Sequence, residues 1–206
     1  REPLGDLFSR LRPEAVVHLA AQIDVRLSVA DPAADALANV IGTIRVLEAA
    51  LAHDAPVVFS STGGAIYGEC DGPASEDAPR RPLAPYGTSK LAGEEYLALW
   101  NRLHGCAHVA LRLGNVYGPR QDPHGEAGVV AIFLQRLRDG VPATIYGDGL
   151  QTRDYVYAGD VADAVARERN ELVLPHDQQD AGIGARVLEE AVQGRRSELL
   201  ELVFAR

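Results

Sequence analysis

The stretch VVFSSTGGAIYG, residues 57–68, decides the fold. An apolar run after Pro56 ends in three hydroxyl residues, Ser60, Ser61 and Thr62, and passes directly into two glycines. A continuous apolar run bounded by turn residues is typical of a strand buried on both faces of a parallel sheet. Its polar end is either an ordinary solvated strand end or a set of hydroxyl groups presented to a ligand.

Strands and helices alternate on both sides of this run. Short apolar or extended segments predict further strands at residues 14–19, 107–113, 144–146 and 153–157. Apolar residues at helical spacing predict helices at residues 31–51, 86–104, 129–139 and 160–169, and a weaker pattern runs through Val187, Leu188 and Val192. This order predicts right-handed βαβ units and therefore an α/β fold with a doubly wound parallel sheet.

Length and composition exclude several classes of protein. The 206 residues suffice for one α/β core or a core with a small second lobe. A net charge of -9 argues against a nucleic-acid partner. No apolar run approaches the ~20 residues that span a bilayer, so no membrane association is expected. Cys70 and Cys106 have no metal-ligand spacing and are typical of free thiols in a reducing compartment, so we expect no metal and a cytoplasmic protein.

Three successive strand ends carry small or polar residues. They are Ala20, Ala21 and Gln22 after the first predicted strand, Thr62 with two glycines after the second, and Gly114 with Asn115 after the third. One such end is usually no more than a strand end. Three in successive βα units favour a shared crevice, because ligands of open α/β sheets bind beyond the carboxyl ends of the strands.

The predicted helix at residues 86–104 begins YGTSK, which places Tyr86 and Lys90 on one helical face. A tyrosine with its ordinary pKa of about 10 is a poor base at neutral pH, but a nearby cation favours the phenolate. Tyr86 is therefore a candidate general base, with Ser61 or Thr62 available to orient a substrate hydroxyl. A Tyr-x-x-x-Lys pattern alone is weak, and the hydroxyl-bearing strand end one loop earlier strengthens it.

Five segments in this order carry a family resemblance: HLAAQ, VVFSSTGGAIYG, YGTSK, NVYGPRQDP and GDGLQTRDYVYAGDVADA. Together they resemble the NAD-dependent epimerase/dehydratase family of extended short-chain dehydrogenases/reductases, and more narrowly bacterial UDP-glucose (UDP-galactose) 4-epimerases. The resemblance covers about residues 10–170. It implies a Rossmann-like fold, NAD as cofactor, a UDP-sugar substrate and a homodimer formed by the helices of residues 32–52 and 87–104.

The resemblance also implies roles for single residues. Tyr86 is the catalytic base, Lys90 holds the nicotinamide ribose and lowers the pKa of the tyrosine, and Thr62 hydrogen-bonds the sugar 4-hydroxyl. The strand end after Val57 thus carries hydroxyls because sugar and cofactor meet there. The implied cofactor-binding residues are Ala20, Ala21, Gln22, Asn39, Ser60, Ser61, Tyr86, Lys90 and Leu113, and the implied substrate-binding residues are Thr62, Asn115, Tyr146 and Arg153.

Sister activities of the family can be compared on the same residues. The dehydratases read Thr-Asp-Glu and the decarboxylases Thr-Ser-Glu where this chain reads Thr62-Gly63-Gly64. Because no carboxylate is present there to assist elimination, epimerisation is favoured. A nucleotide-sugar reductase using the same tyrosine and lysine stays open, and so does a non-catalytic remnant that binds nucleotide sugar or mediates dimerisation.

The family's opening strand and glycine-rich turn over the cofactor pyrophosphate are missing from this sequence. The sequence also contains no methionine, so we expect it to begin inside a longer or processed chain. We predict a partial NAD-binding domain at residues 1–115 that carries the threonine, tyrosine and lysine. Residues 116–206 are predicted to contribute an incomplete substrate lobe.

Overall fold

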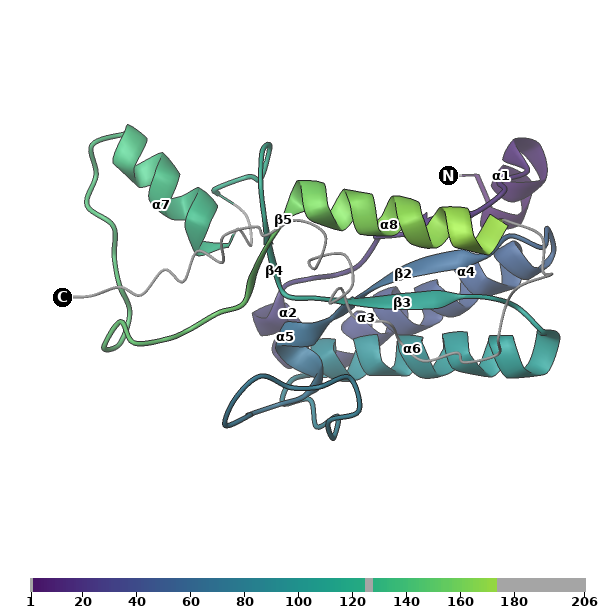
Figure 1. Cartoon of the computed structure of the whole chain (residues 1–206), viewed down its shortest axis with the longest axis horizontal. Helices are drawn as coiled ribbons and strands as arrows, with labels where there is room; N and C mark the ends of the chain where they lie inside the picture. Colours follow the sequence, from purple (N-terminus) through teal and green to yellow (C-terminus); the bar gives the residue numbers. More distant parts are fainter. Residues whose placement is uncertain (1, 125–127, 174–206) are drawn as a thin grey trace.

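The computed structural model describes residues 2–124 and 128–173, and its centre is a three-stranded parallel sheet (Figure 1). The strands are β1 (Val16–His18), β2 (Val57–Thr62) and β3 (Val109–Leu113), in the order β1-β2-β3. β2 is the middle strand, and each of its residues except Ser60 is buried. Its register pairs His18 with Phe59 on one side and Thr62 with Leu113 on the other.

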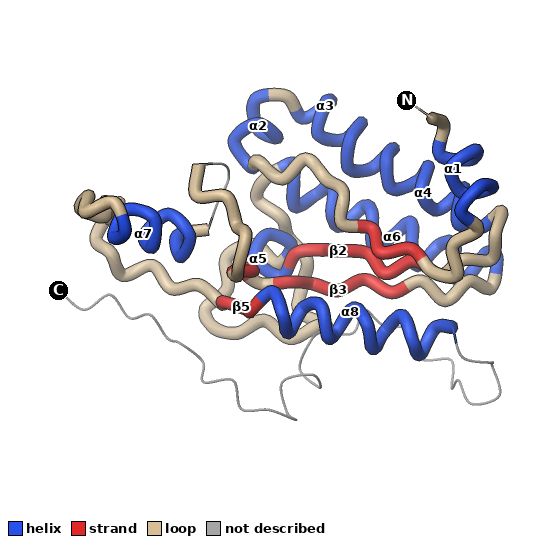
Figure 2. Tube along the Cα trace, turned by 90° about the horizontal axis from the view of Figure 1, so that it is seen from above, coloured by secondary structure: helices blue, strands red, loops and turns tan. Residues whose placement is uncertain are grey.

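Helices cover both faces of this sheet (Figure 2). Val57 and Phe59 point to one face, where they pack with Leu47 and Leu97 from the helices on that side. Val58 points to the other face and packs with Leu111 and Leu113 against the helix that ends the described chain. The alternation of side chains along β2 therefore places the strand in two apolar cores, as the sequence pattern predicts.

The connecting helices explain how the chain reaches each strand. They are α1 (Leu4–Leu11), α2 (Val25–Ala30), α3 (Pro32–Ala36), the π-helical turn η1 (Leu37–Ile41), α4 (Gly42–Leu51), α5 (Gly63–Ile66), α6 (Pro85–His104), α7 (Val129–Arg138) and α8 (Ala158–Val173). The predicted helix at residues 31–51 begins as expected, because the Asp31 side chain accepts from the amide of Ala34 and Pro32 follows it. It is not one regular helix, because η1 interrupts it around Asn39. α6 begins at Pro85 and ends before Gly105, whose φ of 68° closes the helix.

A second, two-stranded parallel sheet follows β3. It pairs β4 (Asn115–Tyr117) with β5 (Tyr155–Tyr157). β4 is not among the strands predicted from the sequence, and it forms because Asn115–Tyr117 pairs with a strand 40 residues later. The strand predicted at residues 144–146 was wrong: this segment is exposed and pairs with no strand of the described chain. The helical pattern through Val187, Leu188 and Val192 lies outside the described residues.

Candidate active site

The first turn of α6 packs directly on the turn that follows β2. A Cβ added to Gly87 would lie 2.4 Å from the carbonyl oxygen of Ala65 and 2.9 Å from Cβ of Pro82. No larger residue fits between these backbones, so the glycine allows α6 to approach α5 closely. The close approach holds Tyr86 beside the turn that begins at Thr62.

Lys90 lies one turn further along α6 and is buried, with 4% of its surface exposed. Its Nζ donates a hydrogen bond of 2.7 Å to the carbonyl oxygen of Ser60. The same Nζ lies 4.7 Å from the centre of the Phe59 ring and 6.0 Å from that of Tyr86. The ammonium is therefore anchored to the end of β2 and faces the phenol, on the helical face that the spacing predicts.

The electrostatics of this pair differ from the expectation that Lys90 lowers the pKa of the tyrosine. Burial lowers the pKa of Lys90 to about 8, while the charge of Asp35 acts in the opposite direction. Burial also raises the pKa of Tyr86, and Asp35 raises it further. Desolvation disfavours the charged form of each group, and at 6.0 Å the ammonium does not outweigh it for the phenol. Tyr86 is thus a neutral phenol at neutral pH in this structure.

The three hydroxyl residues at the end of β2 have different environments. Ser60 contributes its carbonyl oxygen to Lys90. The Ser61 hydroxyl donates to Glu94 on α6, so its hydrogen is engaged within the protein core. The buried Thr62 hydroxyl forms no hydrogen bond within the part of the chain that the structure describes. The hydroxyls of Ser60 and Thr62 are therefore both free of hydrogen bonds within the described residues, and either is available to a ligand.

The end of β1 is fixed by Asn39 from the π-helical turn. Asn39 Oδ1 accepts from the Gln22 amide at 2.8 Å, and its Nδ2 donates to the Gln22 carbonyl at 2.9 Å. The Gln22 side chain is bound in turn to Asp24 and Asp35. Gln22 and Asn39 therefore shape the segment after β1 through contacts within the protein.

The other expected cofactor residues lie at the same edge of the sheet. Ala20 and Ala21 follow β1 after Leu19 and have small, at least partly exposed side chains, and Leu113 ends β3 opposite Thr62. The sheet topology therefore brings the three strand ends to one edge.

The expected substrate residues divide into two groups. Asn115 lies close to the end of β2, since its Oδ1 is 4.0 Å from where a Cβ of Gly64 would be. Tyr146 is 80% exposed. The Arg153 guanidinium donates only to the neighbouring carbonyl of Thr152 among the described residues. The structure therefore brings Asn115 to the site but gives Tyr146 and Arg153 no contact with Tyr86, Lys90 or Thr62.

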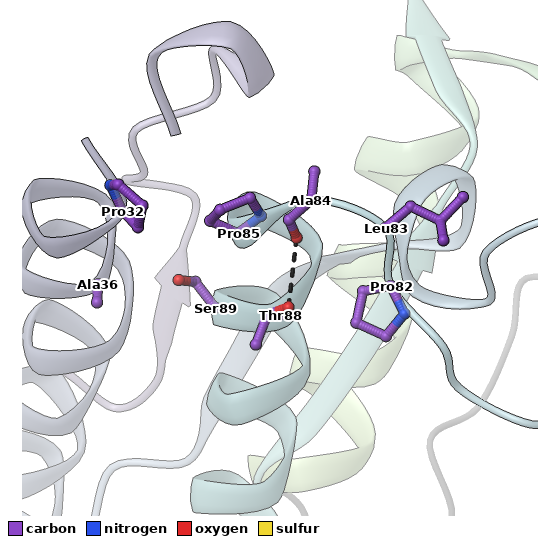
Figure 3. Close-up of a pocket in the computed structure, with 8 residues that line it drawn as sticks. All are labelled: Pro32, Ala36, Pro82, Leu83, Ala84, Pro85, Thr88 and Ser89. Carbon is purple, nitrogen blue, oxygen red and sulfur yellow. Dashed lines mark hydrogen bonds between the residues drawn. The ribbon is translucent and has the colours of Figure 1, made fainter. Parts of the chain in front are cut away.

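An open cavity of about 420 Å³ lies between the starts of α3 and α6 (Figure 3). Its walls are largely apolar and come from residues 32, 36, 82–85, 88 and 89. Tyr86, Lys90 and Thr62 are not among them, so this hollow adjoins the candidate site without containing its reactive groups. Figure 3 shows the Ser89 hydroxyl pointing across the gap toward the helix that carries Pro32 and Ala36.

Two charged features of the site escaped the sequence reasoning. Asp35 is 1% exposed and binds Ser89 at the start of α6. Glu94 forms a buried ion pair with Arg112 at 2.7 Å, and the same arginine donates to Tyr67. The sequence does contain a signal for the ion pair of Glu94 with Arg112. An arginine inside a predicted buried strand requires an acidic partner, and Glu94 lies on the same face of α6 as Lys90.

The described residues hold no group of three or more histidine, cysteine, aspartate or glutamate side chains that could bind a metal ion. No helix among them is both long enough and apolar enough to cross a membrane. The site consists instead of a phenol, an ammonium and a hydroxyl at the carboxyl edge of a parallel sheet.

Fold and site together define a class: a Rossmann-like α/β protein with a short-chain dehydrogenase/reductase type of Tyr-x-x-x-Lys site beside a hydroxyl-bearing strand end. Residues 1–176 match the family model described as the NAD dependent epimerase/dehydratase family. The chain belongs to that family.

Individual relatives are similar over most of this chain. It is 52% identical over 168 residues to a UDP-glucose 4-epimerase of Mycolicibacterium smegmatis, an alignment that covers 80% of this chain and 53% of that protein. A UDP-glucose 4-epimerase of Thermotoga maritima, solved with UDP-glucose, superposes with a TM-score of 0.76 at 49% identity, covering 78% of this chain and 53% of that one. A UDP-glucose 4-epimerase of Thermus thermophilus, solved in complex with NAD, superposes with a TM-score of 0.75 at 49% identity. This match covers 80% of this chain and 55% of that one. The chain thus spans about half the length of the relatives it matches.

Proposed function

We propose that this chain provides the catalytic residues of an NAD-dependent nucleotide-sugar 4-epimerase that acts on UDP-glucose and UDP-galactose. The observation that carries the proposal is the arrangement of Tyr86, Lys90 and the unbonded Thr62 hydroxyl at one sheet edge. The identity of about 50% to UDP-glucose 4-epimerases supports the choice of reaction within the family.

The residues present fit NAD. A lysine ammonium has three N–H donors, and Lys90 uses one of them within the described residues, so two are available to a ribose. The segment after β1 carries only small side chains at Ala20 and Ala21, which allow a flat ring to lie against the backbone. Leu113 would border the same space from β3. NAD held by these residues would supply the acceptor and donor of hydride for the reaction.

The protein's own groups have defined tasks in this proposal. Tyr86 takes the proton of the sugar 4-hydroxyl and gives it back after the 4-keto sugar has turned over. Thr62 hydrogen-bonds the same hydroxyl and orients it. Lys90 supplies a positive charge near the phenol, which favours its ionised form. Elimination of water is not expected, because Gly63 and Gly64 occupy the positions beside Thr62 that carry acids in the dehydratases.

The remaining substrate contacts are proposed from the resemblance. Asn115 and Arg153 hold the diphosphate, and the guanidinium suits this task because it can bind phosphate oxygens with two parallel hydrogen bonds. Tyr146 packs against the uracil ring. The division into residues 1–115 and 116–206 stays a prediction.

A substitution at Tyr86 tests the function. UDP-galactose is given to the purified protein with NAD, and UDP-glucose is measured. We expect Tyr86→Phe to reduce turnover by at least 100-fold while the binding of UDP persists, since general acid–base catalysis contributes about 10²–10⁴-fold. Tyr96→Phe is the matched control, because Tyr96 lies on the same helix and packs on Trp100. Turnover within tenfold of the unmodified protein would remove Tyr86 from its assigned role.

We also propose that two copies associate through α3–α4 and α6, in a cytoplasmic protein whose two cysteines stay free. Leu37 and Leu103 on these helices are 66% and 65% exposed, and Ile41 and Leu99 add further apolar surface. Exposed apolar residues on two neighbouring helices suit a two-fold interface. Light scattering at micromolar concentration checks this, and a monomeric mass would contradict it.

A further inference from the structure

The carboxylate of Asp35 is buried between α3 and α6 without a direct ionic partner among the described residues. It accepts hydrogen bonds from Gln22 Nε2 at 3.0 Å, Asn39 Nδ2 at 3.0 Å and Ser89 Oγ at 2.6 Å. All three donors are neutral, and no ion pair within 4.0 Å joins Asp35 to a cation of the described chain. Burying a charged group in this way is costly, so the arrangement calls for a reason beyond the folding of α3.

Capping of α3 is not that reason. Asp31 already caps this helix by accepting from the Ala34 amide. Asp35 instead connects three separate segments: the end of β1 through Gln22, the π-helical turn through Asn39, and the first turn of α6 through Ser89. Ser89 is the neighbour of Lys90 in the sequence and lies within the same turn as Tyr86.

The chain has 20 lysine and arginine residues in total. Lys90 is the only lysine, and all the others are arginines. A lysine presents a compact ammonium, whereas an arginine presents a planar guanidinium. A buried ammonium tends to lose its proton, because burial favours the neutral amine. The negative charge of Asp35 acts against that loss.

The other charged or titratable groups near Lys90 are few. His18 on β1 is buried beside the Phe59 ring, and burial first and Lys90 second lower its pKa to about 4, which leaves it neutral. Glu94 on α6 and Arg112 on β3 are paired with each other, and Arg45 and Glu48 on α4 form an exposed pair. Asp24, which caps α2, pairs with Arg26. β2, α5 and η1 carry no ionisable side chain, which leaves Asp35 as the carboxylate of the described chain that acts on Lys90.

We propose that Asp35 is a positioning residue of this site, which keeps Lys90 in its ammonium form by its charge and fixes the first turn of α6 through Ser89. This inference rests on the proposed function only for its effect on turnover. The effect on Lys90 itself is a property of the folded chain and requires neither substrate nor cofactor.

The single lysine makes a direct test possible. Incorporating ¹³C-lysine labels only Lys90, and the chemical shift of its Cε reports protonation as pH is varied. Asp35→Asn removes the charge with little change of shape. The Oδ1 atom of the new asparagine can still accept from Gln22 and Asn39, and its amide can donate to the Ser89 hydroxyl. We expect the pKa of Lys90, about 8 in the unmodified chain, to fall, so that less than half of Lys90 is charged at pH 8.

Ser89→Ala is the matched control, because it removes a hydrogen bond of Asp35 but leaves the charge. It should not lower the pKa of Lys90. An unchanged pKa in Asp35→Asn would overturn the proposal, and so would an equal fall in both variants, which would show a loss of structure rather than of charge. If Asp35→Asn does not fold, Asp35→Ser removes the same charge with a smaller polar side chain. The pKa of Lys90 in that variant then tests the proposal in the same way.

Turnover gives a second, separate reading. Asp35 raises the pKa values of both Tyr86 and Lys90, so its removal should shift both limbs of the pH–rate profile to lower pH. A protein without epimerase activity would contradict the proposed function, while the lysine titration would still decide the role of Asp35. An active protein whose profile stays in place in Asp35→Asn would contradict the positioning role and leave the function intact.

Discussion

α6 and α7 are both rich in apolar residues, but only α6 has buried residues. α6 lies along the sheet and buries residues on several of its turns, including Lys90, Glu94 and Leu97. α7 has no buried residue, and Leu134 and Leu137 on it are 61% and 77% exposed. Figure 1 shows α7 standing away from the sheet that α6 covers. The difference teaches that apolar content does not decide burial: α6 is held by small residues and buried polar pairs that α7 lacks.

The same contrast divides the candidate site. Tyr86, Lys90 and Thr62 belong to the sheet part of the chain, residues 4–113, where Lys90 and Thr62 are buried, Tyr86 is half-buried, and Lys90 is held by the Ser60 carbonyl. Tyr146 and Arg153 belong to the outer segment, residues 129–154, most of which is exposed. Substitutions should therefore have large effects on stability in the sheet part and small ones in the outer segment.

The largest expected effect comes from the buried ion pair of the sheet part. Arg112→Met leaves buried Glu94 with only the Ser61 hydrogen bond and a longer ion pair to Arg80 at 3.9 Å. It also removes the bonds of Arg112 to Tyr67 and to the Glu76 carbonyl. We expect a loss of about 3–5 kcal/mol in the free energy of unfolding, measured in urea. Arg153→Met is the control in the outer segment and should change it by less than about 0.5 kcal/mol. Equal effects of the two substitutions on the free energy of unfolding would contradict the contrast between the sheet part and the outer segment.

Acid should destabilise the sheet part through two buried histidines. Burial lowers the pKa of His18 and of His108 to about 4, with Lys90 as a second cause for His18. The unfolded chain binds these protons near pH 6.5 and the folded chain only near pH 4, so stability present above pH 6.5 is lost as the pH falls toward 4. Each histidine contributes up to about 3 kcal/mol.

His108→Gln tests this sign and magnitude. The glutamine carbonyl can still accept from the Val57 amide, which His108 Nδ1 binds at 3.0 Å. Urea titrations at pH 7, 6 and 5 should show a pH dependence reduced by roughly half, because one of two titrating groups is gone. A slope equal to that of the unmodified chain would mean that His108 does not titrate in this range.

A third, smaller effect concerns the close approach of α6 to the sheet. A Cβ on Gly93 would lie 2.8 Å from the Phe59 ring, so Gly93→Ala should cost about 1–3 kcal/mol. Gly42→Ala, also in a helix, meets no atom within 4 Å and should stabilise by about 0.5–1 kcal/mol through helix propensity. Thermal unfolding of both variants checks the opposite signs. A stabilising Gly93→Ala would show that α6 packs less tightly than described.

The sequence predicted the sheet part well because its signals are local. The apolar run before Ser60 specifies β2, and Pro85 and Gly105 mark the ends of α6. Asp35 was missed because an acid in the first turn of a helix looks like an ordinary stabiliser of the helix dipole. Its role depends on Ser89, 54 residues away, and no local pattern reports that contact.

The outer segment was predicted less well for the same reason. Residues 144–146 have strand propensity, but no neighbouring strand of the described chain pairs with them. Asn115–Tyr117 forms a strand only because Tyr155–Tyr157 lies beside it. Propensity states what a segment can form, whereas a pairing partner decides what it does form.

The smallest effect on stability is expected at Tyr146, which lies in the exposed outer segment and is also a proposed substrate contact. The ring is 80% exposed, so Tyr146→Ala should change the free energy of unfolding by less than about 0.5 kcal/mol. If Tyr146 packs against uracil, the same variant should bind UDP more weakly by about 0.5–1.5 kcal/mol, a factor of roughly 2–12. Calorimetric titration of UDP measures this, with Leu150→Ala as the control, since Leu150 is 73% exposed in the same segment. Unchanged UDP affinity in Tyr146→Ala would remove the residue from the substrate site. A marked loss of stability would instead place Tyr146 in a packed contact and break the contrast between the two parts of the chain.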